Sequence, residues 1–279
     1  MSIERRVDVV TQSAIAHMAM TVWPHRLWER TILGMFTACF DASGSENDPK
    51  TPYLAVAGYI STADRWITFS QLWNTRLRED GLDYFRMSEF AHSTKIFAGW
   101  KLEENRRRNL LKDLVELVKT HAIVMFGCAV KISAMKDMTI ETRAQFYLTS
   151  YVLAGMHCAQ EVVKWIHERS NEAQTSPYSL VYEEGDTGEE SLRKRLTEDE
   201  FVFSFQPKRD TVRKTGIISP AFVPLQAADI LAYEVATGVR DGDFERWPAV
   251  QLSGIPGRIG IFDEQDMPGL EERIRASRS

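Results

Sequence analysis

The segment of residues 224–235, PLQAADILAYEV, carries one amide and one carboxylate among apolar side chains. A helix turns once in about 3.6 residues, so Gln226 and Asp229 project from one face. Burying an unpaired carboxylate costs several kcal/mol, and Asp229 should therefore meet a cation, a metal ion or a strong set of donors. These two residues mark a candidate site, for which further acids are expected elsewhere in the chain.

Acids also follow two apolar, β-prone segments. Asp41 comes directly after MFTACF, and Glu183 and Asp186 lie at the end of SLVYEEGD. Phosphodiester hydrolysis needs charge neutralisation, which two Mg²⁺ or Mn²⁺ ions about 4 Å apart can provide on carboxylate ligands. We expect Asp41, Glu183 and Asp229 to be catalytic and, together with Asp186, to bind Mg²⁺ or Mn²⁺.

Each candidate also has a structural explanation. Asp41 before Ser43 is typical of an Asx turn, and acidic runs commonly lie in solvated loops. Lys208 is either a cation that orients substrate or a surface lysine, and Gln226 is predicted to hold water or a phosphate oxygen. Asp229 favours the functional interpretation most, because perturbed acids cluster at sites.

The elements that would position these side chains follow from hydrophobic periodicity. Strands are predicted at 35–40, 53–60, 82–87, 122–132, 179–186 and 201–205. Helices are predicted at 62–79, 103–120, 140–172, 189–197 and 224–235. Adjacent strands followed by alternating helices and strands predict an α/β fold with a mixed sheet of about five to six strands. Ligands gather at the carboxyl ends of such strands, where the acids lie.

This pattern predicts one main domain, residues 34–240, with two appendages. Residues 1–33 form an N-terminal extension of uncertain structure, with a candidate amphipathic helix over 7–20. Residues 241–279 contain several Gly and Pro and are predicted to be an irregular tail, packed on the domain or extending from it.

The composition excludes several classes of protein. With 279 residues, a net charge of −5 and a pI near 5.8, the chain does not coat nucleic acid by bulk electrostatics, although local basic patches remain open. Its three cysteines lack CxxC spacing, which favours neither a zinc site nor a disulfide framework and fits the cytoplasm. Secretory and membrane-spanning segments are not expected. P-loop, GxGxxG and GxSxG motifs are absent.

Four segments together resemble the bacterial and phage domain-of-unknown-function 3800 family. They are DASG at 41–44, AGY at 57–59, YEEGDTG at 182–188 and PLQAADILAYE at 224–234. Hallmarks of this family are an N-terminal Asp-Glu pair and a C-terminal QxxD, and the resemblance covers residues 34–238. It implies an RNase H-like fold and, by analogy with that superfamily, a divalent-metal-dependent nuclease.

The chain departs from the family pattern at two positions. Ala42 replaces the Glu of the Asp-Glu pair, with Glu46 as a candidate substitute. Successive strand residues face opposite sides, so the missing Glu was either a supporting residue or part of the site. Similar members often carry His at the position of Arg86, and arginine favours a phosphate contact over metal coordination. Ser43 and Arg86 are therefore added to the predicted substrate-binding residues.

Two functions follow from these expectations. The first is a Mg²⁺- or Mn²⁺-dependent nuclease or related phosphodiesterase, with nucleic acid as its partner and its oligomeric state open. The alternative is an RNase H-like module with a weak or inactive site, binding nucleic acid or a protein in a phage or defence context. Convergence of Asp41, Glu183 and Asp229 within about 4–6 Å around a cleft would favour the nuclease.

Overall fold

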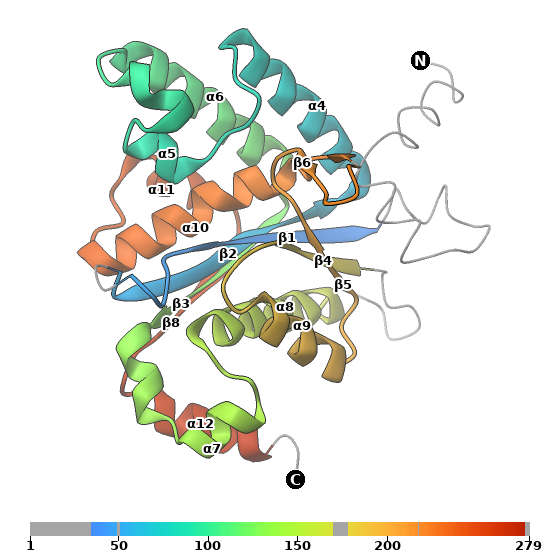
Figure 1. The fold of residues 1–279 in the computed structure, drawn as a ribbon, viewed down its shortest axis with the longest axis vertical. Helices are drawn as coiled ribbons and strands as arrows, with labels where there is room; N and C mark the ends of the chain where they lie inside the picture. The colour runs from blue at the N-terminus through green and yellow to red at the C-terminus, as the bar shows by residue number, and fades with distance from the viewer. Residues whose placement is uncertain (1–34, 49–50, 170–177, 217, 277–279) are drawn as a thin grey trace, which may run out of the picture.

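Six strands form one mixed sheet in the order β5-β4-β1-β2-β3-β8 in the computed structural model (Figure 1). The structure describes residues 35–48, 51–169, 178–216 and 218–276, so the predicted extension 1–33 and its helix at 7–20 lie outside the described residues. β2 runs antiparallel to β1 and β3, whereas β4 is parallel to β1, β5 to β4 and β8 to β3. The strands are β1 (Phe36–Ser43), β2 (Tyr53–Thr62), β3 (Val124–Lys131), β4 (Tyr178–Glu183), β5 (Phe203–Gln206) and β8 (Gly257–Phe262). The predicted α/β fold with a mixed sheet is confirmed.

Helices cover both faces of the sheet (Figure 1). On one face lie α4 (Ala63–Glu79), α5 (Met87–Ala91), η1 (Lys95–Trp100), α6 (Glu104–His121), α10 (Pro224–Asp241) and α11 (Trp247–Leu252). On the other lie α8 (Ser150–His167) and α9 (Glu189–Glu198), with η2 (Ile132–Asp137), α7 (Ile140–Gln145) and α12 (Met267–Ala276) beyond them. In the part of the chain that the structure describes, no helix is both long and apolar enough to cross a membrane.

The strands separate two hydrophobic cores, because alternate side chains point to opposite faces. In β2, Ala55 and Ala57 belong to the core against α10, whereas Val56 and Ile60 belong to the core against α8. The side facing α10 is built from small residues. At Gly127 in β3 an added Cβ would lie 3.1 Å from the Cβ of Ala57. These small side chains let α10 approach the sheet closely and bring its polar residues next to the strands.

Residues 82–87 do not form the predicted third strand, and the prediction is wrong there. The backbone N–H of Phe85 donates to Gln226 Oε1 at 2.8 Å, and that of Met87 donates to the carboxylate of Asp229. The Phe85 ring is fully buried beside Trp73. The β-prone composition of this segment therefore serves packing against α10 and α4, and its backbone groups bond to α10 side chains.

The single helix predicted over 140–172 is also wrong, because the chain forms α7 and α8 there. Between them Tyr147 adopts a positive φ of 54°, which a continuous helix does not allow. Thr149 then caps α8 by accepting a hydrogen bond from the N–H of Val152 at 3.2 Å. Apolar residues before and after the break continue the helical spacing, and for that reason the break was not visible in the sequence.

The residues after Asp241 are not the predicted irregular tail. They form α11, β8 and α12, and β8 pairs with β3 from Met125 opposite Gly257 to Val130 opposite Phe262. At Gly257 an added Cβ would lie 2.0 Å from the carbonyl oxygen of Met125. This glycine permits the close approach of two strands, whereas the sequence suggested a loop.

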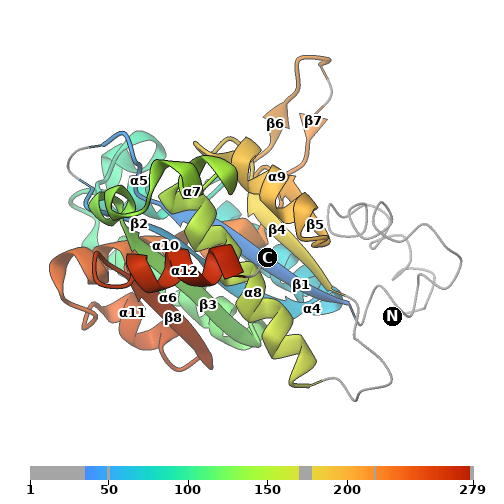
Figure 2. The ribbon, with the colours of Figure 1, turned by 90° about the horizontal axis from the view of Figure 1, so that it is seen from below.

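A two-stranded hairpin, β6 (Thr211–Val212) and β7 (Ile218–Ser219), forms a second small sheet after β5. Figure 2 shows it projecting from the body of the molecule, next to β5 and α9. The hairpin lies between Lys208 and α10 in the chain, so it borders the candidate site described next.

Candidate metal centre

The pleat of the sheet directs Asp41 and Glu183 to the face covered by α10. Cys39 in β1 and Val181 in β4 both belong to the core on that face and are paired in the parallel ladder. Side chains two residues apart lie on the same side of a strand, so Asp41 and Glu183 follow on that side at a common level. The two acids therefore meet α10 near the carboxyl ends of β1 and β4.

Lys208 connects three carboxylates at this position. Its Nζ lies 2.6 Å from Asp41 Oδ2, 2.9 Å from Glu183 Oε2 and 2.9 Å from Asp229 Oδ1. The lysine follows β5, which lies beside β4, and is only 4% exposed. The interpretation of Lys208 as a surface lysine is therefore wrong. Asp229 meets a cation, as the burial of its charge requires.

Three carboxylates form a group that could hold a metal ion. Asp41, Glu183 and Asp186 each place one oxygen within 4.8 Å of the others. Asp186 lies in the turn after β4, and its Oδ2 is buried without a hydrogen-bond partner among the described residues. Hard divalent cations bind such oxygen ligands, and an unsatisfied buried oxygen is costly without one. The donor set therefore fits Mg²⁺ or Mn²⁺.

Asp229 lies beside this group without belonging to it. Its Oδ1 accepts a hydrogen bond from Lys208, and its Oδ2 accepts one from the N–H of Met87 at the start of α5. Both oxygens are thus used within the protein, and they hold Lys208 and the segment before α5 in place. The catalytic and metal-binding roles of Asp229 stay predictions.

The acids of the site have raised pKa values. Burial raises the pKa of Asp41 to about 7, with Lys208 opposing and the charge of Glu183 adding to the effect. Burial and the charge of Asp41 raise the pKa of Asp186 to about 7, and burial raises that of Asp229 to about 6. Burial disfavours the charged form of Lys208, but the surrounding carboxylates outweigh it and raise the lysine pKa. The site holds more negative charge than Lys208 neutralises.

Arg86 is a further cation at this site. Burial alone would lower its pKa, but the charges of Asp229, Glu183 and Asp41 outweigh burial and raise it. Its Nε is buried without a hydrogen-bond partner in the described part of the chain. Counting Asp186, four carboxylates face the two cations Arg86 and Lys208, so with every carboxylate ionised the site has an excess of two negative charges. One divalent cation would neutralise that excess.

Gln226 is buried, with 1% of its surface exposed, and bonded on both sides. Its Oε1 accepts hydrogen bonds from Trp73 Nε1 at 2.9 Å and from the N–H of Phe85 at 2.8 Å. Its Nε2 donates to the carbonyl oxygen of Lys208 at 2.8 Å. These contacts differ from the predicted contact with substrate, and they make Gln226 a residue that positions Lys208.

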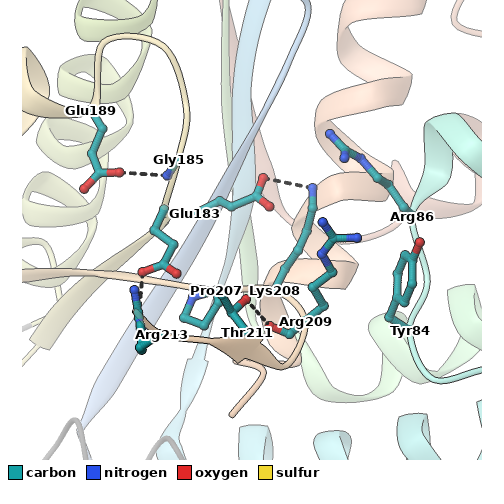
Figure 3. A pocket seen from close by; sticks show the side chains of 11 residues that line it. Tyr84, Arg86, Glu183, Gly185, Glu189, Pro207, Lys208, Arg209, Thr211 and Arg213 are labelled. Atoms are coloured by element: carbon teal, nitrogen blue, oxygen red, sulfur yellow. Dashed lines mark hydrogen bonds and ion pairs between the residues drawn. The ribbon is translucent and has the colours of Figure 1, made fainter. Parts of the chain in front are cut away.

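A cleft of about 490 Å³ opens beside the acids (Figure 3). Its lining combines acidic, basic and aromatic side chains: Glu183, Glu184, Glu189, Arg86, Lys208, Arg209, Arg213 and Tyr84. Arg86 and Arg209 lie on the side of Lys208 away from Glu183 in Figure 3. Ser43, which was predicted to bind substrate, lies at the end of β1 and is not part of the lining. A cleft of this volume lies within the range that takes small ligands.

Sequence reasoning missed Tyr84, Arg209 and Arg213 as lining residues. Lys208 and Arg209 follow the strand β5 after Pro207, so the rule that ligands gather at strand ends could have selected them together. Tyr84 carried no such signal, because its segment resembled a strand.

Ala42 and Glu46 contribute no carboxylate to the group. Ala42 packs against the core on the α8 face, opposite to Asp41, so a glutamate there would start from the other side of the sheet. The carboxylate of Glu46 accepts a hydrogen bond from the N–H of Ser150 at the start of α8. The described carboxylates near Asp41 therefore come from β4, the turn after it and α10.

Comparisons with known proteins add no relative. No family model matches the chain, and searches of curated proteins and of solved structures find no match. The resemblance to the domain-of-unknown-function 3800 family stays a prediction.

Proposed function

We propose that this protein is a Mg²⁺- or Mn²⁺-dependent phosphodiesterase that acts on nucleic acid. The observation that carries the proposal is the group of Asp41, Glu183 and Asp186, whose oxygens lie within 4.8 Å of one another beside a cleft. These three residues would hold the cation, which when bound neutralises the charge of the reacting phosphate. The unsatisfied Oδ2 of Asp186 supports this assignment.

The other charged residues have separate roles in the proposal. Lys208 holds the carboxylates of Asp41, Glu183 and Asp229 together and keeps their charges close without disrupting the fold. Arg86 extends to the cleft with an Nε that lacks a partner in the described chain. A guanidinium group matches phosphate geometry, so Arg86 would bind a phosphate oxygen.

The order of the strands supports an RNase H-like fold. β1, β2 and β3 form an antiparallel meander, and β4 and β5 add in parallel on the other side of β1. Acids at the ends of β1 and β4 and on α10 agree with the site that the family resemblance implies. Fold likeness alone does not establish activity, so the carboxylates carry the argument.

A second candidate is a nucleic-acid-binding module without catalysis. The observation in its favour is the ammonium group of Lys208, which already lies within 2.9 Å of three carboxylates, as a metal ion would. If this lysine alone suffices to neutralise the site, no divalent cation would bind. The two candidates differ in metal binding and can be separated by measuring it.

The test compares the wild type with Asp41→Asn and Asp186→Asn, using Glu271→Gln as a matched control. Glu271 is a buried acid on α12, away from the group. Calorimetric titration with Mn²⁺ should give binding in the wild type and the control. Cleavage of labelled DNA and RNA should fall at least about 100-fold in the two site variants. If the wild type binds oligonucleotides but does not bind Mn²⁺, the second candidate, a binding module without catalysis, would be the correct one.

A further inference from the structure

The cleft beside the metal centre continues into a second hollow. This hollow has a volume of about 650 Å³ and shares Tyr84, Arg209 and Thr211 with the cleft. Its other lining residues come from α4, which contributes Asn74 and Arg78, from the loop before α5, and from the hairpin and the loop after it. Together the two hollows form a groove that runs from Glu183 past Tyr84 to Arg78.

Two arginines of this groove form no ion pair among the described residues, and a third is incompletely hydrogen-bonded. Arg86 has a buried Nε without a hydrogen bond, and Arg78 and Arg209 form no ion pair in that part of the chain. Arg213, by contrast, pairs with Glu184 at 2.8 Å. Acids such as Asp83 and Glu189 also line the groove, but they form no ion pair with Arg78 or Arg209, so these two guanidinium groups are open to an anionic ligand. Phosphate groups of a nucleic acid strand are ligands of the matching charge and geometry.

Tyr84 offers an aromatic face in the middle of the groove. Its hydroxyl donates to Glu89 Oε2 at 2.8 Å, and the other oxygen of Glu89 accepts a hydrogen bond from Lys95 at 2.9 Å. These bonds hold the ring from one end. The guanidinium carbon of Arg209 lies over one face of the ring, 5.6 Å from the centroid, so the other face is the one left for a base. Aromatic faces next to arginines are how single-stranded nucleic acids are bound without sequence preference.

The charged groups of the site are recessed to different extents. Asp41 is 1% exposed and Lys208 4%, whereas Glu183 and Asp186 are only partly buried. A single strand is narrow and flexible enough to enter, whereas enzymes that act on recessed atoms of a duplex must first extrude a nucleotide.

We propose that the groove binds single-stranded nucleic acid, with phosphates on Arg86 and Arg209 and a base stacked on Tyr84. Arg78 contacts the next phosphates along the strand. This inference rests on the proposed function, because it assigns the substrate class of the same site.

The experiment measures binding separately from cleavage. Fluorescence anisotropy with a labelled 12-nucleotide single strand and with the matching duplex is recorded in EDTA at low salt. The wild type should bind the single strand at least about tenfold more tightly than the duplex. Tyr84→Ala and Arg209→Ala should each weaken single-strand binding about fivefold or more, whereas Tyr84→Phe keeps the ring and stays close to the wild type.

Arg273→Ala serves as the control, because it removes the same charge from α12 at the other end of the molecule (Figure 1). Equal affinity for strand and duplex, or equal effects of Arg209→Ala and Arg273→Ala, would overturn the inference. Binding without Mn²⁺-dependent cleavage would overturn the proposed function and leave this inference standing. The opposite outcome has two parts: Mn²⁺-dependent cleavage of bis(p-nitrophenyl) phosphate is unchanged in Tyr84→Ala, and the protein shows no preference for single strands. That outcome would overturn this inference and leave the proposed function standing.

Discussion

Two sites in this protein bury carboxylates, and they differ in the groups that surround the negative charge. Glu271 on α12 is 8% exposed, and its oxygens accept hydrogen bonds from both Thr139 and Thr142 hydroxyls at 2.5 Å and from Arg275 at 2.7 Å. The Thr139 N–H adds a fourth bond at 3.2 Å. Hydrogen bonds from Thr139 and Thr142 lower the pKa of Glu271, so its charged form is the stable one.

At the candidate metal centre, Asp41 and Asp186 have other carboxylates among their neighbours. Burial raises the pKa of Asp41 and of Asp186 to about 7, and one oxygen of Asp186 lacks a partner in the described part of the chain. Burial of a carboxylate therefore does not by itself indicate function. Donors around Glu271 make it a structural residue, whereas the excess of negative charge around Asp41 is suited to binding a cation.

The largest expected effect comes from removing the central cation of the acidic cluster. Lys208→Met should lower the free energy of unfolding by about 3–5 kcal/mol, because it leaves three carboxylates buried without their partner. Arg275→Met, the equivalent change at Glu271, should cost about 1 kcal/mol or less, since the Arg275 side chain is 54% exposed. Urea unfolding in EDTA measures both. Similar losses of unfolding free energy in Lys208→Met and Arg275→Met would contradict the difference between the two sites.

A smaller loss is expected for Gln226→Ala. The change leaves Trp73 Nε1, the Phe85 N–H and the Lys208 carbonyl without their buried partner, which should cost about 2–3 kcal/mol. Because Gln226 offers no free oxygen to a metal, Mn²⁺ should still raise the unfolding midpoint of the variant. Loss of the Mn²⁺ response at unchanged stability would show that Gln226 acts in the site and not in positioning Lys208.

The smallest effect is a pH dependence of opposite sign at the two clusters. The pKa of Asp41 and Asp186 is about 7 in the folded protein, against an ordinary value of 3.8, so the unfolded chain loses these protons first. The free energy of unfolding without metal should therefore fall as pH rises from about 4 to 7, by roughly 1 kcal/mol for each of the two acids between pH 6 and 7. Asp186→Asn should flatten this decline in urea unfolding experiments.

Glu271 behaves in the other direction. Its pKa is lowered, so its contribution to stability is complete above its ordinary value of 4.5 and is lost as pH falls through the folded-state value. Glu271→Gln should weaken the acid side of the stability curve and leave the slope between pH 6 and 7 intact. A change of that upper slope in Glu271→Gln would contradict the assignment.

Local patterns were enough for the elements that bring the acids to one end of the sheet. Short apolar, β-prone segments predicted β1, β2, β3, β4 and β5, and helical patterns predicted α4, α6, α9 and α10. The pattern failed where long-range pairing decides. β8 pairs with β3, more than 120 residues away in the chain, and its glycines suggested a loop.

Local sequence is enough to predict which acids can meet, because Asp41 and Glu183 follow strands and the apolar helix carries Asp229. The contact of all three acids with one lysine could be seen only in the folded protein. Lys208 lies in a segment without local periodicity, and Gln226, bound to Trp73 and Phe85, holds it among the acids. Electrostatic balance depends on distances between segments far apart in the chain, which no local pattern encodes.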